Sequence, residues 1–90
     1  MINYKCGEFA VAKCGHDKGS MYVIVKSDEQ YVYLVNGKNR KYANPKKKKH
    51  IHVQIIHKID SVIKGKIDDK EMINDEDIVA AIKKQLKNVY

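Results

Sequence analysis

The chain has 90 residues, 18 of them Lys or Arg and 11 Asp or Glu, with a formal net charge of +7. This length forms one domain with a thin core, which leaves little room for a deep active-site cleft. The apolar runs are far too short to span a bilayer, and the N-terminus lacks an apolar stretch of signal-peptide length. We therefore expect a cytoplasmic protein that has no membrane partner.

Short strands separated by turn residues are predicted for the first two thirds of the chain. The predicted strands are Glu8–Cys14, Ser20–Lys26, Gln30–Asn36, a short segment near Arg40–Ala43, and His50–Ile55. Asn36-Gly37 indicates a tight hairpin, because a type I′ turn needs positive φ at both central residues. Five short antiparallel strands predict a small barrel, which removes exposed sheet edges.

The second and third strands are apolar on both faces. In the second strand, Met21, Val23 and Val25 alternate with Tyr22 and Ile24; in the third, Val32 and Leu34 alternate with Tyr31, Tyr33 and Val35. One set of side chains fills the barrel. The other set needs a cover, and the C-terminal third of the chain can provide one.

The C-terminal third is predicted to be helical and to pack on the barrel. A first helix is indicated by the spacing of Ile56, Ile59, Val62 and Ile63, with Gly65 as its stop. A second helix begins after the N-cap Asn74, has acidic residues in its first turn, and carries the apolar stripe Ile78, Ile82, Leu86 and Val89. The expected organisation is a barrel over residues 1–56, including the basic segment 38–50, and a helical extension over residues 57–90.

The positive charge is concentrated in the middle of the chain. Residues 31–60 hold eight basic residues against one acid, Asp60, whereas the first and last thirds each have a net charge of zero. Most of the excess lies between Lys38 and Lys49. Such segregation favours an anionic partner over a merely solvated surface, which remains the alternative interpretation.

The order of residues in the first half resembles a KOW motif. Its slots are filled by Gly7-Glu8, Phe9 and Val11, Gly15-His16-Asp17-Lys18-Gly19, and Tyr22-Val23-Ile24-Val25. With the following Asn36-Gly37, Arg40-Lys41 and Pro45–Lys49, the chain is similar to small bacterial KOW-domain RNA-binding proteins. These in turn resemble a large-subunit ribosomal protein family of archaea and eukaryotes. The resemblance implies an SH3-like five-stranded barrel, an RNA partner on or near the ribosome, and Gly19 at the family's invariant glycine.

Candidate RNA contacts lie in the first inter-strand loop and in the basic segment. They are Lys13, His16, Lys18, Gly19, Lys38, Arg40, Lys41, Tyr42, Lys46, Lys47, Lys48, Lys49, His50 and His52. Lysines favour phosphate and shape recognition over base readout, and Tyr42 is the candidate for base stacking. Tyr31 and Tyr33 are better explained by cross-strand packing.

No catalytic site, metal site or cofactor is predicted. The histidines stand among lysines, which repel a cation, and no ligand set accompanies them. Cys6 and Cys14 lack the spacing of a disulfide framework or a redox motif and are expected to be structural thiols. The acidic residues at 68–77 are explained by helix capping and solvation.

RNA binding, to ribosomal or other structured RNA, is therefore the expected function, with ribosomal proteins as further candidate partners. A protein-interaction adaptor of a ribonucleoprotein complex, using the barrel and the apolar helical tail, is the first alternative. A binder of DNA or of an anionic membrane is the second, and only the family resemblance argues against it.

Overall fold

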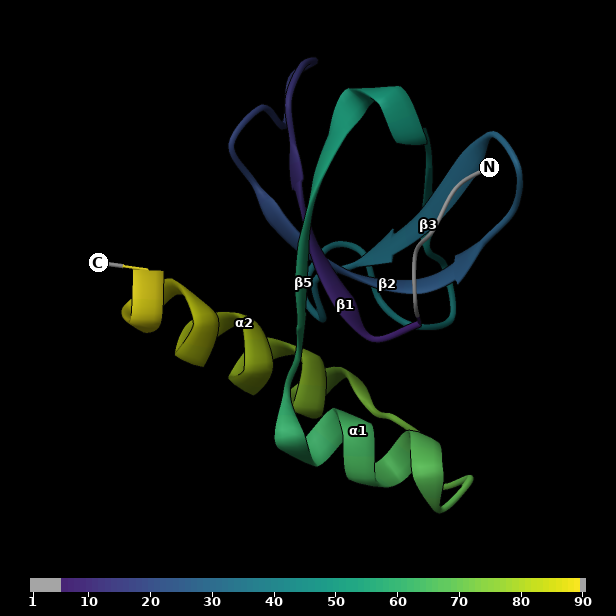
Figure 1. Cartoon of the computed structure of the whole chain (residues 1–90), viewed down its shortest axis with the longest axis vertical. Coiled ribbons are helices and arrows are strands. Elements are labelled where there is room, and N and C mark those ends of the chain that lie inside the picture. Colours follow the sequence, from purple (N-terminus) through teal and green to yellow (C-terminus); the bar gives the residue numbers. More distant parts are fainter. Residues whose placement is uncertain (1–5, 90) are drawn as a thin grey trace.

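The computed structural model describes residues 6–89, which form one five-stranded antiparallel sheet and two helices (Figure 1). The elements are β1 (Glu8–Ala12), β2 (Met21–Ser27), β3 (Tyr31–Val35), β4 (Lys46–Lys49), the 3₁₀ turn η1 (His50–His52), β5 (Val53–Ile59), α1 (Ser61–Asp68) and α2 (Asp75–Val89). The strand order is β4-β3-β2-β1-β5, so β4 and β5 are the edges and the sheet is not closed. In the described part of the chain, no helix is long and apolar enough to cross a membrane.

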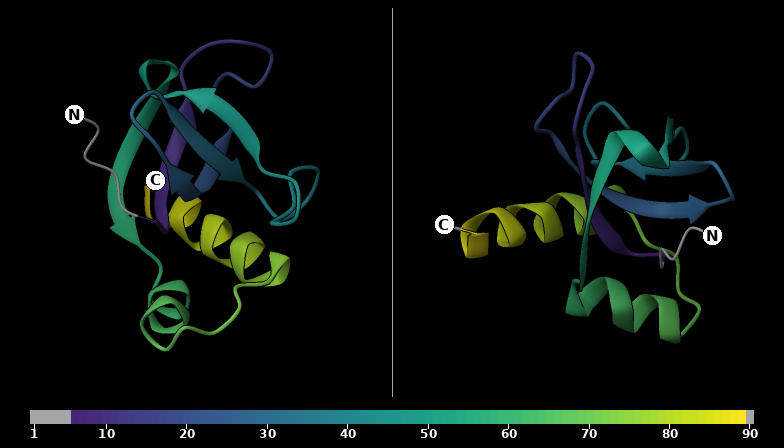
Figure 2. Two further views of the ribbon diagram at one scale, coloured as in Figure 1. Left: turned by 90° about the vertical axis from the view of Figure 1, so that its right-hand side faces the viewer. Right: turned by 45° about the horizontal axis from the view of Figure 1, so that its top comes forward.

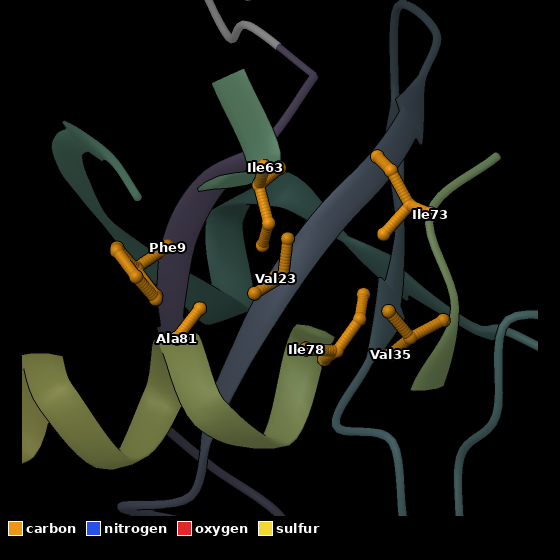
Figure 3. Packing of buried hydrophobic residues seen from close by; sticks show 7 residues of the cluster. All are labelled: Phe9, Val23, Val35, Ile63, Ile73, Ile78 and Ala81. Atoms are coloured by element: carbon orange, nitrogen blue, oxygen red, sulfur yellow. The ribbon is translucent and has the colours of Figure 1, made fainter. Parts of the chain in front are cut away.

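The two faces of the sheet bury separate apolar clusters. One consists of Ala10, Ala12, Tyr22, Ile24, Val32, Leu34 and Val53 on the concave side. The other joins Phe9, Val23 and Val35 of the sheet to Ile63, Ile73, Ile78 and Ala81 of the C-terminal third. In Figure 3 these seven side chains meet between the strands and the helices. The prediction that the second apolar face of the central strands is covered by the C-terminal third is therefore confirmed.

The two helices are fixed by side-chain caps and by an ion pair. Asp60 caps α1 by accepting hydrogen bonds from the backbone N–H groups of Val62 and Ile63 (3.0 and 3.3 Å). At α2, Asn74 and Asp77 bond reciprocally to each other's backbone N–H, at 3.2 and 3.1 Å, so the predicted N-cap is confirmed. Lys66 of α1 then reaches the Asp77 carboxylate at 2.6 Å and joins the two helix ends.

The fourth strand differs from the prediction. The segment Arg40–Ala43 is not a strand, and β4 is formed by the lysine run that follows it. Asn36-Gly37 does not form a two-residue hairpin turn, because β3 and β4 are connected by the longer loop of residues 36–45. Lysine favours strands weakly, so local propensity gave no sign of this strand; it is held by pairing with β3.

The predicted fifth strand and first helix are also displaced. The segment His50–Ile55 divides between η1 and β5, and β5 continues through Ile56 and Ile59, which pair with Phe9 and Glu8 of β1. The register shifts between these two β1 residues, so the paired isoleucines stand three positions apart. The bulge thus produced a spacing that imitates a helical stripe.

Gly65 does not end α1, which continues beyond it. The helix closes instead with the hydrogen bonds of a Schellman motif: Glu71 N–H donates to Lys66 O (2.8 Å) and Lys70 N–H to Ile67 O (3.2 Å). Lys70 takes the left-handed position that glycine usually occupies, with φ of 57°. The prediction that Gly65 ends the helix is wrong; the true end carries no recognisable sequence signal, because a lysine rarely takes the left-handed position that Lys70 occupies.

The predicted stripe of α2 is only partly buried. Ile78 is fully buried and Ile82 packs partly against the same cluster, whereas Leu86 is 43% exposed. The side chain of Val89 lies outside the described part of the structure. The buried face of α2 instead includes Ala81 and Gln85.

Candidate nucleic-acid interface

The loop between β1 and β2 is a tight turn built on two glycines. Gly15 and Gly19 have φ of 91° and 89°, in the left-handed region that glycine adopts without steric cost. Gly19 N–H donates to Ala12 O (2.8 Å), and Lys18 N–H donates to Gly15 O (3.2 Å). These bonds fix the backbone and leave Lys18 exposed beside Gly19.

Asp17 lies at the centre of this loop and joins it to β4. Its carboxylate contacts Lys46 Nζ at 2.9 Å and Lys48 Nζ at 2.7 Å, and it accepts a 2.8 Å hydrogen bond from the Tyr22 hydroxyl. Lys48 Nζ also donates to Cys14 O at 2.9 Å. Two basic segments 30 residues apart in the sequence therefore form one continuous surface, held by one carboxylate.

The pKa values of this cluster reflect a carboxylate that remains charged. Desolvation of Asp17 opposes ionisation, but hydrogen bonds from Lys48, Lys46 and Tyr22 outweigh it and hold the pKa of Asp17 well below its usual range. Desolvation, followed by the hydrogen bond to Asp17, raises the pKa of Tyr22 to about 12. The phenol therefore stays protonated and donates to Asp17 at neutral pH.

The four lysines of β4 divide between two roles. Lys46 and Lys48, paired with Leu34 and Val32 in the ladder, are half-buried and turn toward Asp17. Their aliphatic stems can cover the concave apolar cluster while the ammonium groups are satisfied. Lys47 and Lys49 are exposed on the other face, where the Lys47 ammonium lies 4.2 Å from the centre of the Tyr31 ring.

The 3₁₀ turn η1 extends the same basic surface. Lys13 N–H donates to His52 O at 2.8 Å, which sets the start of the β1–β2 loop beside η1. Both views show this loop and η1 at the end of the sheet that lies away from α1 (Figures 1 and 2). On the other side, His50 N–H donates to Gln30 O (3.0 Å), so the acidic β2–β3 turn borders the basic surface.

The loop of residues 36–45 places the remaining candidates elsewhere. The Asn36 side-chain oxygen accepts bonds from Lys38 N–H and Arg40 N–H (both 3.0 Å), and Tyr42 N–H donates to the Asp75 carboxylate at 2.8 Å. This loop therefore lies against the N-terminus of α2, whose first turn is acidic. The basic segment is thus not one strip, as the sequence suggested, but two groups of cations.

The structure brings together most, but not all, of the predicted contacts. The first group lies on the β1–β2 loop, β4 and η1; in it, Lys47 and Lys49 point to the face of β4 opposite Asp17, and its members are Lys13, His16, Lys18, Gly19, Lys46, Lys47, Lys48, Lys49, His50 and His52. The second group lies on the loop of residues 36–45 and comprises Lys38, Arg40, Lys41 and Tyr42. Sequence reasoning missed the role of Asp17, although a lone carboxylate in a loop of a basic half-chain was a usable signal.

One histidine contacts a buried carboxylate. His57 Nδ1 lies 2.8 Å from the buried Glu8 carboxylate, on the ladder between β1 and β5. Among residues 6–89, no group of three or more His, Cys, Asp or Glu side chains could hold a metal ion. Cys6 and Cys14 are free cysteines on the surface. The Cys6 sulfur is partly shielded from solvent beside Val25 O, to which it donates at 3.3 Å, and this desolvation raises the pKa of the thiol.

No protein-family model matches this chain, and no curated protein matches it. The functional argument therefore depends on the residues and their geometry. The feature with the clearest chemical meaning is the cationic surface that Asp17 organises.

Proposed function

We propose that the protein is an RNA-binding module of the KOW type and that the surface formed by the β1–β2 loop, β4 and η1 is its RNA-binding site, called here the loop–β4 surface. The observation that carries the proposal is the link through Asp17, which joins the Gly15–Gly19 loop to the lysine strand. These are the two segments that the family resemblance singles out. Because Asp17 holds the loop against β4, the cations of both segments can contribute to one binding site.

We propose an SH3-like barrel as the fold. The first and last strands, β1 and β5, pair, and the register shifts between β1 and β5 and between β2 and β3, where bulges increase the local bend. The 3₁₀ turn η1 connects the two edge strands directly. Each feature supports a sheet that curls around the concave cluster.

The chemistry of the surface fits phosphate contacts. Lys13, Lys18, Lys47 and Lys49 have exposed side chains, and the single carboxylate of the loop is already occupied by two other lysines. Ammonium groups neutralise phosphates without reading bases, so recognition depends on backbone and shape. A structured RNA, such as a ribosomal RNA helix, presents closely spaced phosphates to such a surface.

The remaining parts of the proposal follow from this chemistry. The protein acts in the cytoplasm as a component or a factor of a ribonucleoprotein, with RNA as its partner and ribosomal proteins as its neighbours. It binds without catalysis and needs no cofactor.

Ultraviolet crosslinking in cells, followed by sequencing of the RNA and mass spectrometry of the peptides, tests the proposal. The expected crosslinks lie in residues 13–20 and 46–52, on ribosomal or other structured RNA. An absence of RNA, or crosslinks confined to α1 and α2, would contradict it.

A further inference from the structure

A groove runs along one side of α2, where this helix passes β2 and the loop between β3 and β4. One hollow of about 360 Å³ is lined by the end of the β1–β2 loop, β2, the β3–β4 loop and α2. A second hollow of about 450 Å³ lies beside it, toward the start of α2. Val79 and Lys83 line both, so the two hollows form one depression along the helix.

The floor of the groove is apolar and accessible. Val79, Ile82 and Leu86 follow a spacing of three and four, which places them on one side of α2, and Met21 of β2 completes the floor. Leu86 is 43% exposed, whereas Ile78 on the neighbouring side is fully buried in the core. The helix thus has one apolar side that holds the fold together and another that faces a groove.

Charge along the groove is polarised. Lys38 and Lys83 flank the hollow beside β2, and both are exposed. Asp75 and Glu76 line the hollow at the start of α2. Lys41 also lines that hollow and Lys83 borders both, so the carboxylates there are balanced by cations, whereas the hollow beside β2 has cations alone. The carboxylate of a bound segment is therefore favoured beside β2, which fixes the orientation of the segment.

We propose that this groove binds a protein partner through a segment with a large apolar side chain beside an Asp or Glu. The apolar side chain fills the floor at Leu86, and the partner's carboxylate meets Lys38 and Lys83. RNA is the poorer occupant, because the floor is apolar, the carboxylates at the start of α2 offset the cations there, and no aromatic ring among the lining residues offers a base a stacking surface. This interaction does not use the lysines of the loop–β4 surface, although the groove adjoins that surface at Gly19.

Selection of random peptides displayed on phage, with the full chain as the target, tests the proposal. Enriched peptides should combine a large apolar residue with a neighbouring Asp or Glu. Their affinity should fall about tenfold or more in Leu86→Lys and in Lys83→Glu, both of which change exposed side chains. The matched control, Lys64→Glu, makes the same charge change on the exposed side of α1 and should bind as the unaltered chain does.

Several results would overturn the proposal. One is a selection that enriches nothing, and another is enriched peptides that bind Leu86→Lys undiminished. Sedimentation of the unaltered chain as a dimer that Leu86→Lys dissociates would assign the groove to a second copy of the chain. An equal loss of RNA affinity in Leu86→Lys would assign the groove to the RNA surface.

Discussion

Asp17 shows how one side chain can determine the shape of a surface. An unpaired carboxylate in a basic loop would weaken phosphate binding by competing for cations. Here its charge is satisfied by Lys46 and Lys48, and the same contacts hold the loop against β4. The two lysines consequently act as structural residues, and the exposed Lys47 and Lys49 are the ones left to meet a partner.

Replacing Asp17 with Asn should destabilise the fold, because two half-buried ammonium groups lose their carboxylate. Hydrogen bonds to charged groups contribute about 1.5–3 kcal/mol each, so we expect a loss of about 1–3 kcal/mol in the free energy of unfolding at neutral pH. Urea unfolding of Asp17→Asn and of the exposed control Glu29→Gln measures this difference. Equal stability of the two variants would show that the cluster does not hold the loop.

The lowered pKa of Asp17 also predicts an acid dependence. The unfolded carboxyl titrates at about pH 3.9, whereas the folded carboxylate stays ionised to lower pH. Its stabilisation is therefore complete above that value and is lost as pH falls toward the folded pKa. The free energy of unfolding should be measured between about pH 6 and about pH 2, a range that covers this titration. It should fall less steeply with decreasing pH in Asp17→Asn than in the unaltered chain.

Tyr22 gives a spectroscopic test of the same cluster. Its pKa of about 12 lies above that of an ordinary tyrosine, because desolvation and the bond to Asp17 favour the protonated phenol. An absorbance titration of tyrosinate should show a last step near pH 12, which is missing in Tyr22→Phe. A Tyr22→Phe titration that keeps this late step would contradict the assignment.

At the scale of elements, the edge strand β4 has two explanations for its lysines. Charged side chains on an edge strand oppose pairing with another chain, and that role alone requires no partner. It does not account for Asp17, which draws Lys46 and Lys48 inward and away from the edge. Edge protection by Lys47 and Lys49 is compatible with phosphate binding by the same side chains.

The junction of the β3–β4 loop with α2 depends on one glycine. Gly37 has φ of 79°, and a Cβ there would lie 2.5 Å from Asp75 O and 2.7 Å from Val79 Cγ2. Gly19 has a similar φ of 89° but open space around it. An alanine at Gly19 would meet backbone strain alone, whereas an alanine at Gly37 would meet both backbone strain and a steric clash.

Gly37→Ala should cost more stability than Gly19→Ala. Left-handed backbone costs an alanine about 1–2 kcal/mol, and we expect that loss at both positions. The clash with α2 should add about 1–3 kcal/mol at Gly37 alone. Equal losses by urea unfolding would mean that the loop and α2 separate freely.

The two sides of α2 predict different costs of truncation. Ile78 is fully buried between the sheet and the helix, so Ile78→Ala should lose about 2–5 kcal/mol. Leu86 is 43% exposed, so Leu86→Ala should stay within about 0.5 kcal/mol of the unaltered chain. Thermal unfolding of both variants checks this, and a large loss at Leu86 would mean that the groove is filled in the folded protein.

At the scale of the whole molecule, alternation and turn chemistry predicted the first half well. The first three strands begin within one residue of their predicted positions, and the predicted cap at Asn74 forms. Short continuous apolar runs bounded by turn residues are reliable where both faces of a strand are buried, as in β2 and β3. The expected cover for the second face follows from the same pattern, because an apolar face must be buried somewhere.

The second half of the sheet was harder to predict because long-range contacts determine it. β4 pairs through lysines that favour no strand, and the bulge between Ile56 and Ile59 of β5 imitates a helical period. The division of the basic segment could not be seen either. It depends on Asp17 drawing β4 to one loop and Asp75 drawing Tyr42 to the helix.

The salt dependence of RNA affinity tests the central claim, the loop–β4 surface, most directly. If four to six phosphates are neutralised, log K against log[salt] should have a slope of about −3 to −5. Lys47→Gln with Lys49→Gln should reduce that slope by about two, whereas the control Lys58→Gln with Lys64→Gln should leave it unchanged. A slope near zero, or equal slopes for the two double variants, would contradict the claim.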